Sequence, residues 1–324
     1  MIKIKQNTFF GISLLLLSCQ IEGMELYVAT DGSDSNTGTI DAPFATIIHA
    51  RNTVRKKIAD SYQGNITVSL RGGVYRLEET LVFGLEDSAP EGYNVRYQAY
   101  QNEKPIITSG KLISGWEKLT SFSSELPIVA QGNVWVADIE SAKNWQFRTL
   151  FDGEKMLSRA RSAGFVPTME CPAPSLAHRW QEMNTLGFPE GKLRNWDNLE
   201  DVEIFIRPTH QWLVNYLPIE KVDEQNGIAT TSIPGTYRLC KVVKKDWDET
   251  CWVENVLEAL DKPGEWVLNS KTGKLYYWPE SGKPGDNISA PVVRELVLVE
   301  GKNVDVVEGD VPVRGLIFDG LTFT

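Results

Sequence analysis

Cysteine is scarce in this chain, with four residues in 324 positions. Once Cys19 is set aside as part of a targeting signal, three thiols are too few and too scattered to form a disulfide framework. No CxxC pair is present, which excludes a zinc knuckle of that kind. Cys240 and Cys251 either pair in an oxidising compartment or act as small buried apolar residues.

Positive charge is also in deficit. The sequence has 33 Lys and Arg against 43 Asp and Glu, for a formal net charge of −10. Nucleic-acid binding needs basic residues that neutralise phosphates, so nucleic acid is not expected as a partner. The 42% hydrophobic content and the 10 Trp, 10 Tyr and 12 Phe instead indicate a globular, aromatic-rich protein.

The chain lacks an apolar run of the length that crosses a bilayer as a helix. Phe9–Leu17 is the apolar stretch near the start, and it falls well short of the roughly 20 residues that spanning requires. Lys3 and Lys5 precede it, as in the basic start of an export signal.

Leu16-Leu17-Ser18-Cys19 has the form of a bacterial lipobox. We therefore expect residues 1–18 to be removed as a lipoprotein signal peptide and Cys19 to carry lipid. Gln20 is not the Asp that favours retention in the inner membrane. The predicted location is the outer membrane, on its periplasmic or cell-surface side, with an ordinary secretory signal as the alternative.

Residues 26–55 predict the capped first turn of a parallel solenoid. A short strand, Leu26–Ala29, is followed by turn-forming Asp, Ser, Asn and Gly residues. Thr46 is placed to be the N-cap of a helix whose apolar positions follow helical spacing: Ile47, Ala50, Val54 and Ile58. Such a helix would cover the open end of the first coil.

Short strand-like runs then follow one another without a long helix between them: Ile66–Leu70, Tyr75–Leu77, Thr80–Phe83, Val95–Tyr97 and Ile106–Thr108. An antiparallel sandwich would give the same pattern of short strand-like runs. Three strands per coil is, however, how a parallel β-helix is wound, and the capping helix favours that architecture.

The middle of the chain has a different pattern. Turn signals at Asp152-Gly153, Asn226-Gly227 and Lys271–Gly273 each lie between strand-like runs and predict hairpins. Hairpins belong to an antiparallel sheet, so this region is predicted to be an insertion. Strand-like segments return at Val311–Thr324.

The predicted fold class is therefore all-β: a right-handed parallel β-helix with a capping helix, carrying an inserted antiparallel β-sandwich-like domain. The predicted boundaries are 19–116 for the cap and first coils, 117–299 for the insertion and 300–324 for the return to the helix. Because the last run has no cap, the chain is expected to be truncated at its C-terminus; the alternative is a short natural variant closed by a partner.

Several motifs occur in a recognisable order: Tyr27-Val28, Gly32-Ser33-Asp34, Pro43–Ile47, Leu70–Tyr75, Gly110–Trp116, Arg159–Arg161, Asp201–Glu203, Lys274–Pro279 and Ile317–Phe323. With them the chain resembles the pectate-lyase-like β-helix proteins of gut Bacteroidetes, and is most similar to glycoside hydrolase family 141 (GH141). The resemblance implies a sheet domain inserted after the first coils. It also implies catalytic carboxylates on later coils, so no position here inherits a catalytic role.

Glycoside hydrolysis requires two carboxyl groups about 5 to 10 Å apart. The densest acidic cluster is Asp246, Asp248 and Glu249 around Trp247, which is expected to be a solvated loop. Asp319 follows a strand-like run and is expected to form a turn. The catalytic residues consequently stay unknown from the sequence.

Trp180, His210 and Trp212 are the candidate substrate-binding residues. Indole rings stack on sugar rings, and imidazoles donate hydrogen bonds to hydroxyl groups. His210 and Trp212 flank Gln211 and would share one face of a strand. The alternative for each tryptophan is packing in the core of a small sheet domain.

Asp34–Gly38 has the D-x-N-x-G spacing of half a calcium loop but lacks the distal Glu. An Asx turn can have the same residue pattern and is the alternative. No metal or other cofactor is expected. Three functions stay open: a glycoside hydrolase acting on a pectic plant cell-wall polysaccharide or oligosaccharide, a pectate-type lyase, and a non-catalytic glycan-binding or inactive fragment. The membrane is expected to be a partner only through the lipid anchor.

Replacing the predicted lipid-bearing residue tests the location. Cys19→Ala should move the protein from the membrane fraction to the soluble periplasm, because no thiol remains to be acylated. Cell fractionation with immunoblotting measures this shift, with the unmodified chain as the control. Unchanged partitioning of the Cys19→Ala variant would contradict the lipoprotein prediction.

Overall fold

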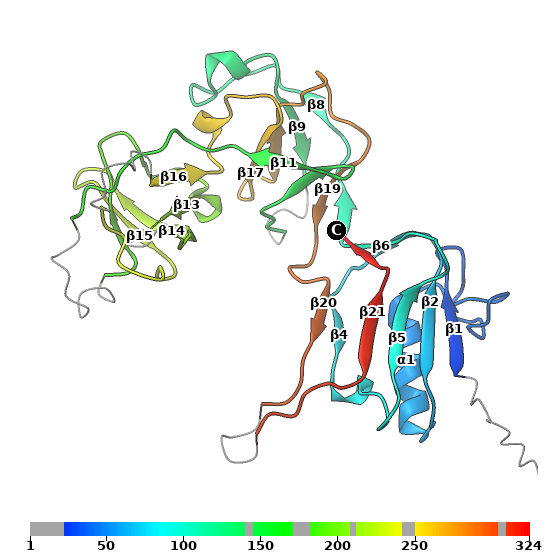
Figure 1. Ribbon diagram of the computed structural model, residues 1–324. Helices are drawn as coiled ribbons and strands as arrows, with labels where there is room; N and C mark the ends of the chain where they lie inside the picture. The colour runs from blue at the N-terminus through cyan, green and yellow to red at the C-terminus, as the bar shows by residue number, and fades with distance from the viewer. Residues whose placement is uncertain (1–22, 140–144, 171–181, 208–211, 242–249, 304–308) are drawn as a thin grey trace, which may run out of the picture. The chain divides into compact units, whose positions relative to one another are not determined.

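The computed structural model describes residues 23–139, 145–170, 182–207, 212–241, 250–303 and 309–324 (Figure 1). The regular secondary structure of these residues is mostly β-strand, with one α-helix, which confirms the all-β prediction. They form two compact units. Unit 1 holds the described residues up to Tyr75 together with Leu81–Ile107 and Val297–Phe323, and unit 2 holds Arg76–Thr80 and Thr108–Leu296. No helix in the described ranges has the length and apolar character needed to cross a bilayer.

Unit 1 is built from parallel strands. One sheet has the order β1 (Met24–Val28), β2 (Ile66–Leu70), β5 (Val95–Ala99) and β21 (Leu316–Asp319), all paired in parallel. A second sheet joins β22 (Thr322–Phe323), β6 (Pro105–Thr108) and β3 (Gly73–Arg76), and a third pairs β20 (Val297–Val299) with β4 (Leu81–Phe83). Figure 1 shows β21, near the end of the chain, beside β5.

The chain visits these three sheets in a repeating order. After β2 it passes through β3 and β4, and after β5 it passes through β6 and, much later, β20; β21 and β22 then begin the next round. Parallel pairing resumes at β20, ahead of the Val311 where the sequence suggests a return. A three-residue run, Val297–Val299, is too short to stand out as a strand in the sequence.

An aromatic cluster fills the interior of unit 1. Phe83 and Tyr97 are buried, and Phe318 of β21 lies against both, with ring centroids 5.2 Å from Phe83 and 5.7 Å from Tyr97. In-register pairing places Phe318 directly beside Tyr97. Side chains from three successive passes of the chain therefore stack on one another, which ties the passes together through burial of large apolar rings.

The capping helix forms where the sequence predicts it. Helix α1 spans Ile47–Ala59, the Thr46 side chain accepts a hydrogen bond from the His49 amide at 3.1 Å, and Ile47, Ala50 and Val54 are buried. Asp34 fixes the start of this helix: its Oδ1 accepts from the amides of Ala45 and Thr46, each at 2.9 Å. The single carboxylate of the D-x-N-x-G segment therefore holds the N-cap residue Thr46 in place.

Unit 2 contains two sheets. The larger has the order β7 (Gly110–Leu112), β19 (Ile288–Pro291), β10 (Leu150–Asp152), β11 (Lys155–Arg159), β17 (Glu265–Asn269), β18 (Lys274–Tyr277), β9 (Trp135–Asp138) and β8 (Glu117–Lys118). The smaller has the order β12 (Thr185–Gly187), β15 (Ile228–Thr231), β14 (Asn215–Asp223), β13 (Glu203–Ile206) and β16 (Cys251–Glu254). Short 3₁₀ turns are η1 (Leu85–Asp87) in unit 1 and η2 (Ile128–Ala130), η5 (Leu199–Asp201) and η6 (Leu257–Ala259) in unit 2.

The three predicted hairpins are confirmed. They connect β10 to β11, β14 to β15 and β17 to β18, each in antiparallel register. Gly153, Gly227 and Gly273 have φ values of 60°, 64° and 72°, which an L-residue with a side chain adopts at a cost. Among the described strands of unit 2, β11 and β17 pair in parallel, and Glu170 and Lys241 form an isolated parallel bridge. The boundaries at 116/117 and 299/300 stay predictions, while the compact units divide at Ile107/Thr108 and Leu296/Val297.

The cysteine pairing considered from the sequence does not form. Cys251 is a free thiol at the start of β16, fully buried in the core and paired in register with Ile206 of β13. Burial raises the pKa of this thiol well above its ordinary value, because the thiolate would lose its hydration. Cys240 is disulfide-bonded to a residue other than Cys251. Proximity in sequence was therefore a poor guide to pairing.

Asn255 connects separate parts of unit 2 through its fully buried side chain. Its Nδ2 donates to the carbonyl oxygens of Leu268 at 2.7 Å and Asp201 at 3.1 Å, and its Oδ1 accepts from the Leu268 amide at 2.7 Å. Asn255 has a positive φ of 68°, a conformation that Asn tolerates better than most residues. One side chain thus joins the end of β16 to β17 and to η5.

Asn255→Ala should lower the free energy of unfolding by about 3 to 5 kcal/mol, because it leaves buried backbone groups of Leu268 and Asp201 without these partners. Urea denaturation followed by circular dichroism measures the change. Asn133→Ala is the matched control, since the exposed Asn133 side chain makes one hydrogen bond, to the Val129 carbonyl. Equal losses in the two variants would contradict the role given to Asn255.

Candidate functional site

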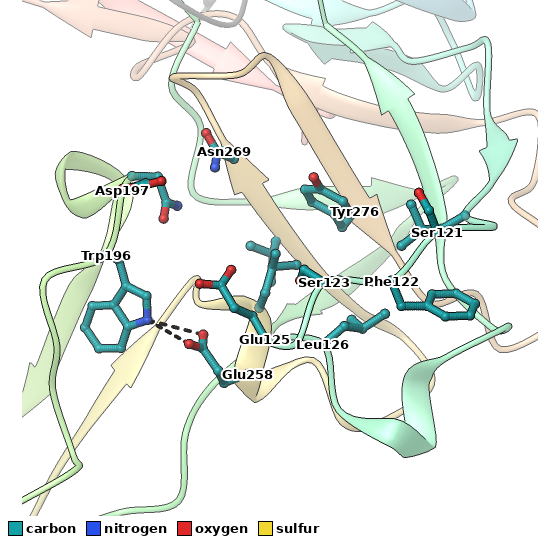
Figure 2. A pocket seen from close by; sticks show the side chains of 14 residues that line it. Ser121, Phe122, Ser123, Glu125, Leu126, Trp196, Asp197, Glu258, Asn269 and Tyr276 are labelled. Carbon is teal, nitrogen blue, oxygen red and sulfur yellow. Dashed lines mark hydrogen bonds between the residues drawn. The ribbon is translucent and has the colours of Figure 1, made fainter.

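Unit 2 contains a pocket with a volume of about 410 Å³ (Figure 2). Its walls come from four places: the segment 119–126, the turn before η5, the η6 turn and the hairpin of β17 and β18. The lining includes three carboxylates, Glu125, Asp197 and Glu258, and three aromatic side chains, Phe122, Trp196 and Tyr276. Carboxylates and aromatic rings in one concave site are typical of sites that bind polar organic ligands.

Trp196 and Glu258 define one side of the pocket. The Trp196 Nε1 donates to both carboxylate oxygens of Glu258, each at 3.2 Å, as the dashed lines in Figure 2 show. Trp196 is held in a turn in which the Leu199 amide donates to the Trp196 carbonyl at 3.2 Å. Glu258 lies in η6, three residues after Asn255.

Arg194 forms ion pairs with two carboxylates at this pocket. Its Nη2 lies 2.9 Å from Glu125 Oε1 and also forms an ion pair with Glu258. All three side chains are between 32% and 45% exposed, so solvent screens these pairs and each contributes modestly to stability. The arrangement fixes the positions of the two glutamates and occupies part of their acceptor capacity.

The opposite wall is the β17 and β18 hairpin, which places Asn269 and Tyr276 at the pocket. Burial raises the pKa of Tyr276, with smaller contributions that include the charge of Glu125. The phenol therefore stays protonated at neutral pH and is available as a hydrogen-bond donor. Asn269 adds an amide, although its Oδ1 already accepts from the Thr272 amide at 3.0 Å.

This set of groups is suited to binding hydroxyl groups. Donors, acceptors and an indole edge surround a space in which two of the three carboxylates share one guanidinium partner. A retaining or inverting hydrolase needs one carboxyl group that gives up a proton and one that attacks or activates water. Glu125 and Glu258 share one arginine partner instead of taking separate environments. Among the described residues, no group of three or more His, Cys, Asp or Glu is arranged to hold a metal ion.

Of the substrate-binding and acidic candidates singled out from the sequence, only Trp212 and Asp319 fall within the described ranges. Trp180, His210 and Cys19 are outside the described residues, as are Asp246, Asp248 and Glu249. Trp212 is 74% exposed and does not line the pocket. The substrate-binding role of Trp180, His210 and Trp212 thus stays a prediction.

Asp319 has a simple structural role. It ends β21, and its Oδ2 accepts from Arg96 on the neighbouring β5 at 2.7 Å. Sequence reasoning missed the pairing of Trp196 with Glu258, which are 62 positions apart. Trp196 belongs to the tryptophan-rich middle of the chain, but no local pattern indicates its partner.

Residues 132–280 match the sequence model of the GH141 insertion domain. Most of the pocket, from Trp196 to Tyr276, falls within this match. The chain is also 34% identical over 95 residues to the uncharacterised protein YwoF of Bacillus subtilis and 30% identical over 126 residues to the pectate lyase PEL9 of Emericella nidulans. These alignments cover 29% and 39% of this chain.

A solved structure described as a glycoside hydrolase has a similar fold, with a TM-score of 0.65 and 22% identity over 93% of this chain. The chain spans 50% of that protein, 18% of YwoF and 27% of PEL9. The predicted resemblance to GH141-type, pectate-lyase-like proteins is confirmed.

Glu258→Ala should cost about 1 kcal/mol of unfolding free energy, since it removes the acceptor of the Trp196 indole and one partner of Arg194. Glu125→Ala should cost less than about 0.5 kcal/mol, because it removes only an exposed ion pair. Urea denaturation gives both values, and tryptophan fluorescence should change only in Glu258→Ala. The reverse order of the two variants would show that the Trp196 contact does not organise the pocket.

Proposed function

We propose that this chain is part of an exported glycoside hydrolase that acts on a pectic plant cell-wall glycan. The observation that carries the proposal is the match of residues 132–280 to the GH141 insertion domain. The glycoside hydrolase with the similar fold adds support for the architecture. Both are statements about relatives, so the substrate is assigned by analogy.

The proposed architecture of unit 1 is a right-handed parallel β-helix. Its support is the repeated order in which the chain visits three sheets, with parallel, in-register pairing of successive passes. The right hand follows from the strong preference of twisted parallel strands for right-handed crossovers. In the sequence, most of unit 2 is inserted between strands β6 and β20 of unit 1.

Export as an outer-membrane lipoprotein fits a polysaccharide-degrading role, because a polymer is met outside the cytoplasm. Cys19 is the proposed attachment site. The protein would contact the membrane through lipid alone, which leaves unit 1 and unit 2 in water.

A pectate-type lyase is the second candidate, and the similarity to the pectate lyase PEL9 favours it. A lyase abstracts the proton next to a uronate carboxylate and leaves a double bond in the product. A hydrolase adds water and leaves no such bond. A non-catalytic glycan-binding protein is the third possibility, and the pocket alone would serve it.

A panel of pectic oligosaccharides separates these candidates. We expect sugar release without a gain in ultraviolet absorbance when the complete gene product is assayed. The 324-residue chain should show little turnover, because the two glutamates of its pocket are paired with Arg194 and Asp319 is paired with Arg96. Ultraviolet-absorbing products would favour the lyase. Binding without any turnover by the complete product would leave the non-catalytic role.

A further inference from the structure

The outer face of the five-stranded sheet in unit 2 carries a row of aromatic residues. Along β13, Ile204 and Ile206 point into the core, and Phe205 alternates to the other face. Antiparallel register places Tyr216 of β14 and Trp252 of β16 on either side of Phe205. The Trp252 and Phe205 rings stack at 3.7 Å, and Tyr216 meets Phe205 edge to face at 5.2 Å.

Two arginines adjoin this row. The Arg161 guanidinium lies 5.2 Å from the centre of the Trp252 ring, and the Arg207 guanidinium lies 5.9 Å from the centre of Phe205. Both arginines are exposed, and neither forms an ion pair with another described residue. We call Arg161, Arg207, Phe205, Tyr216 and Trp252 the arginine–aromatic face.

The carboxylates beside this face are already neutralised. Glu203 and Glu254 lie opposite each other on β13 and β16, an arrangement that repels unless cations lie between them. Arg148 and Arg159 both pair with Glu203, whose side chain is only 4% exposed, and Arg159 is also 4.0 Å from Glu254. Arg161 itself lies opposite Glu254 in an isolated antiparallel bridge. Among the described residues of this face, four guanidinium groups thus accompany two carboxylates, so positive charge exceeds negative charge there.

A local positive excess is unusual in a chain with a net charge of −10. Guanidinium groups recognise carboxylates through paired, charge-assisted hydrogen bonds. Tyr216 is 47% exposed and offers an apolar ring and a hydroxyl group. Burial, followed by the charges of Glu254 and Glu203, raises the pKa of Tyr216 against the opposing effect of Arg161 and Arg159, so the hydroxyl stays a donor at neutral pH.

We propose that the arginine–aromatic face binds a carboxylated sugar, a uronate unit of an acidic glycan, through Arg161 and Arg207 with Tyr216 against the sugar ring. This inference takes its sugar class from the proposed function. It adds a binding surface that is separate from the pocket, since none of the five residues lines it. The face would hold the polymer by its charge and would leave the chemistry to other residues.

Titration calorimetry of the 324-residue chain with oligogalacturonate tests the proposal, with the fully methyl-esterified oligosaccharide as the uncharged comparison. Arg161→Gln and Arg207→Gln should each weaken binding about threefold to fivefold, and the double variant about tenfold. Lys155→Gln is the matched control, since Lys155 is 58% exposed in the same unit and pairs with Glu280. It should bind like the unmodified chain.

The wild-type chain alone gives an independent test that needs no folded variant. Its affinity for oligogalacturonate should fall as salt is raised, and the methyl ester should bind at least tenfold more weakly. Equal binding of acid and ester, or an unchanged double variant, would overturn the proposal. Equally tight binding of polyglutamate would overturn the sugar assignment. Because turnover is not measured, a failed activity assay would count against the proposed function and leave this result intact.

Discussion

The hydrogen bonds of the buried Asn255 side chain are the constraint on which unit 2 depends. They link the end of β16 to β17 and to the last residue of η5. The pocket draws its walls from segments on either side of this link, because Trp196 precedes η5, Glu258 follows Asn255 and Tyr276 lies on the hairpin partner of β17. The arginine–aromatic face depends on the same link through β13 and β16. A single amide thus sets the position of two surfaces.

The two surfaces divide the polar chemistry of the unit between them. At the pocket, one arginine is shared by two glutamates and Asp197 adds a third carboxylate, so the cavity offers hydrogen-bond acceptors in excess of cations, together with an indole. On the sheet face, four arginines accompany Glu203 and Glu254 among the described residues. Similar residue types therefore give the two surfaces different electrostatic character, set by the ratio of guanidinium to carboxylate groups.

Features encoded within a few residues could be read from the sequence, and contacts between distant residues could not. Gly153, Gly227 and Gly273 mark their hairpins because a positive φ is a local requirement. Thr46 marks its helix because an N-cap acts over three residues. The link from Trp196 to Glu258 and the parallel pairing of β11 with β17 arise only when the sheets assemble. Cys251 shows the same limit. It is close to Cys240 in the sequence, yet it is a free thiol and Cys240 forms its disulfide with another residue.

The late return of β20 and β21 has a consequence for how the chain assembles. Arg96 and Asp319, which hydrogen-bond across β5 and β21, are 223 positions apart. Closing so long a loop costs conformational entropy, and this cost grows slowly with loop length. The entropy is lost before the contact between the two strands contributes any stability, so the contact forms late. Until unit 2 has formed and brought its two ends together, the edge of β5 that pairs with β21 stays exposed, with Tyr97 on that strand. The folding rate of the inserted unit therefore limits how soon β21 can pair with β5. A chain whose insertion folds slowly would leave the edge of β5 open to aggregation for longer.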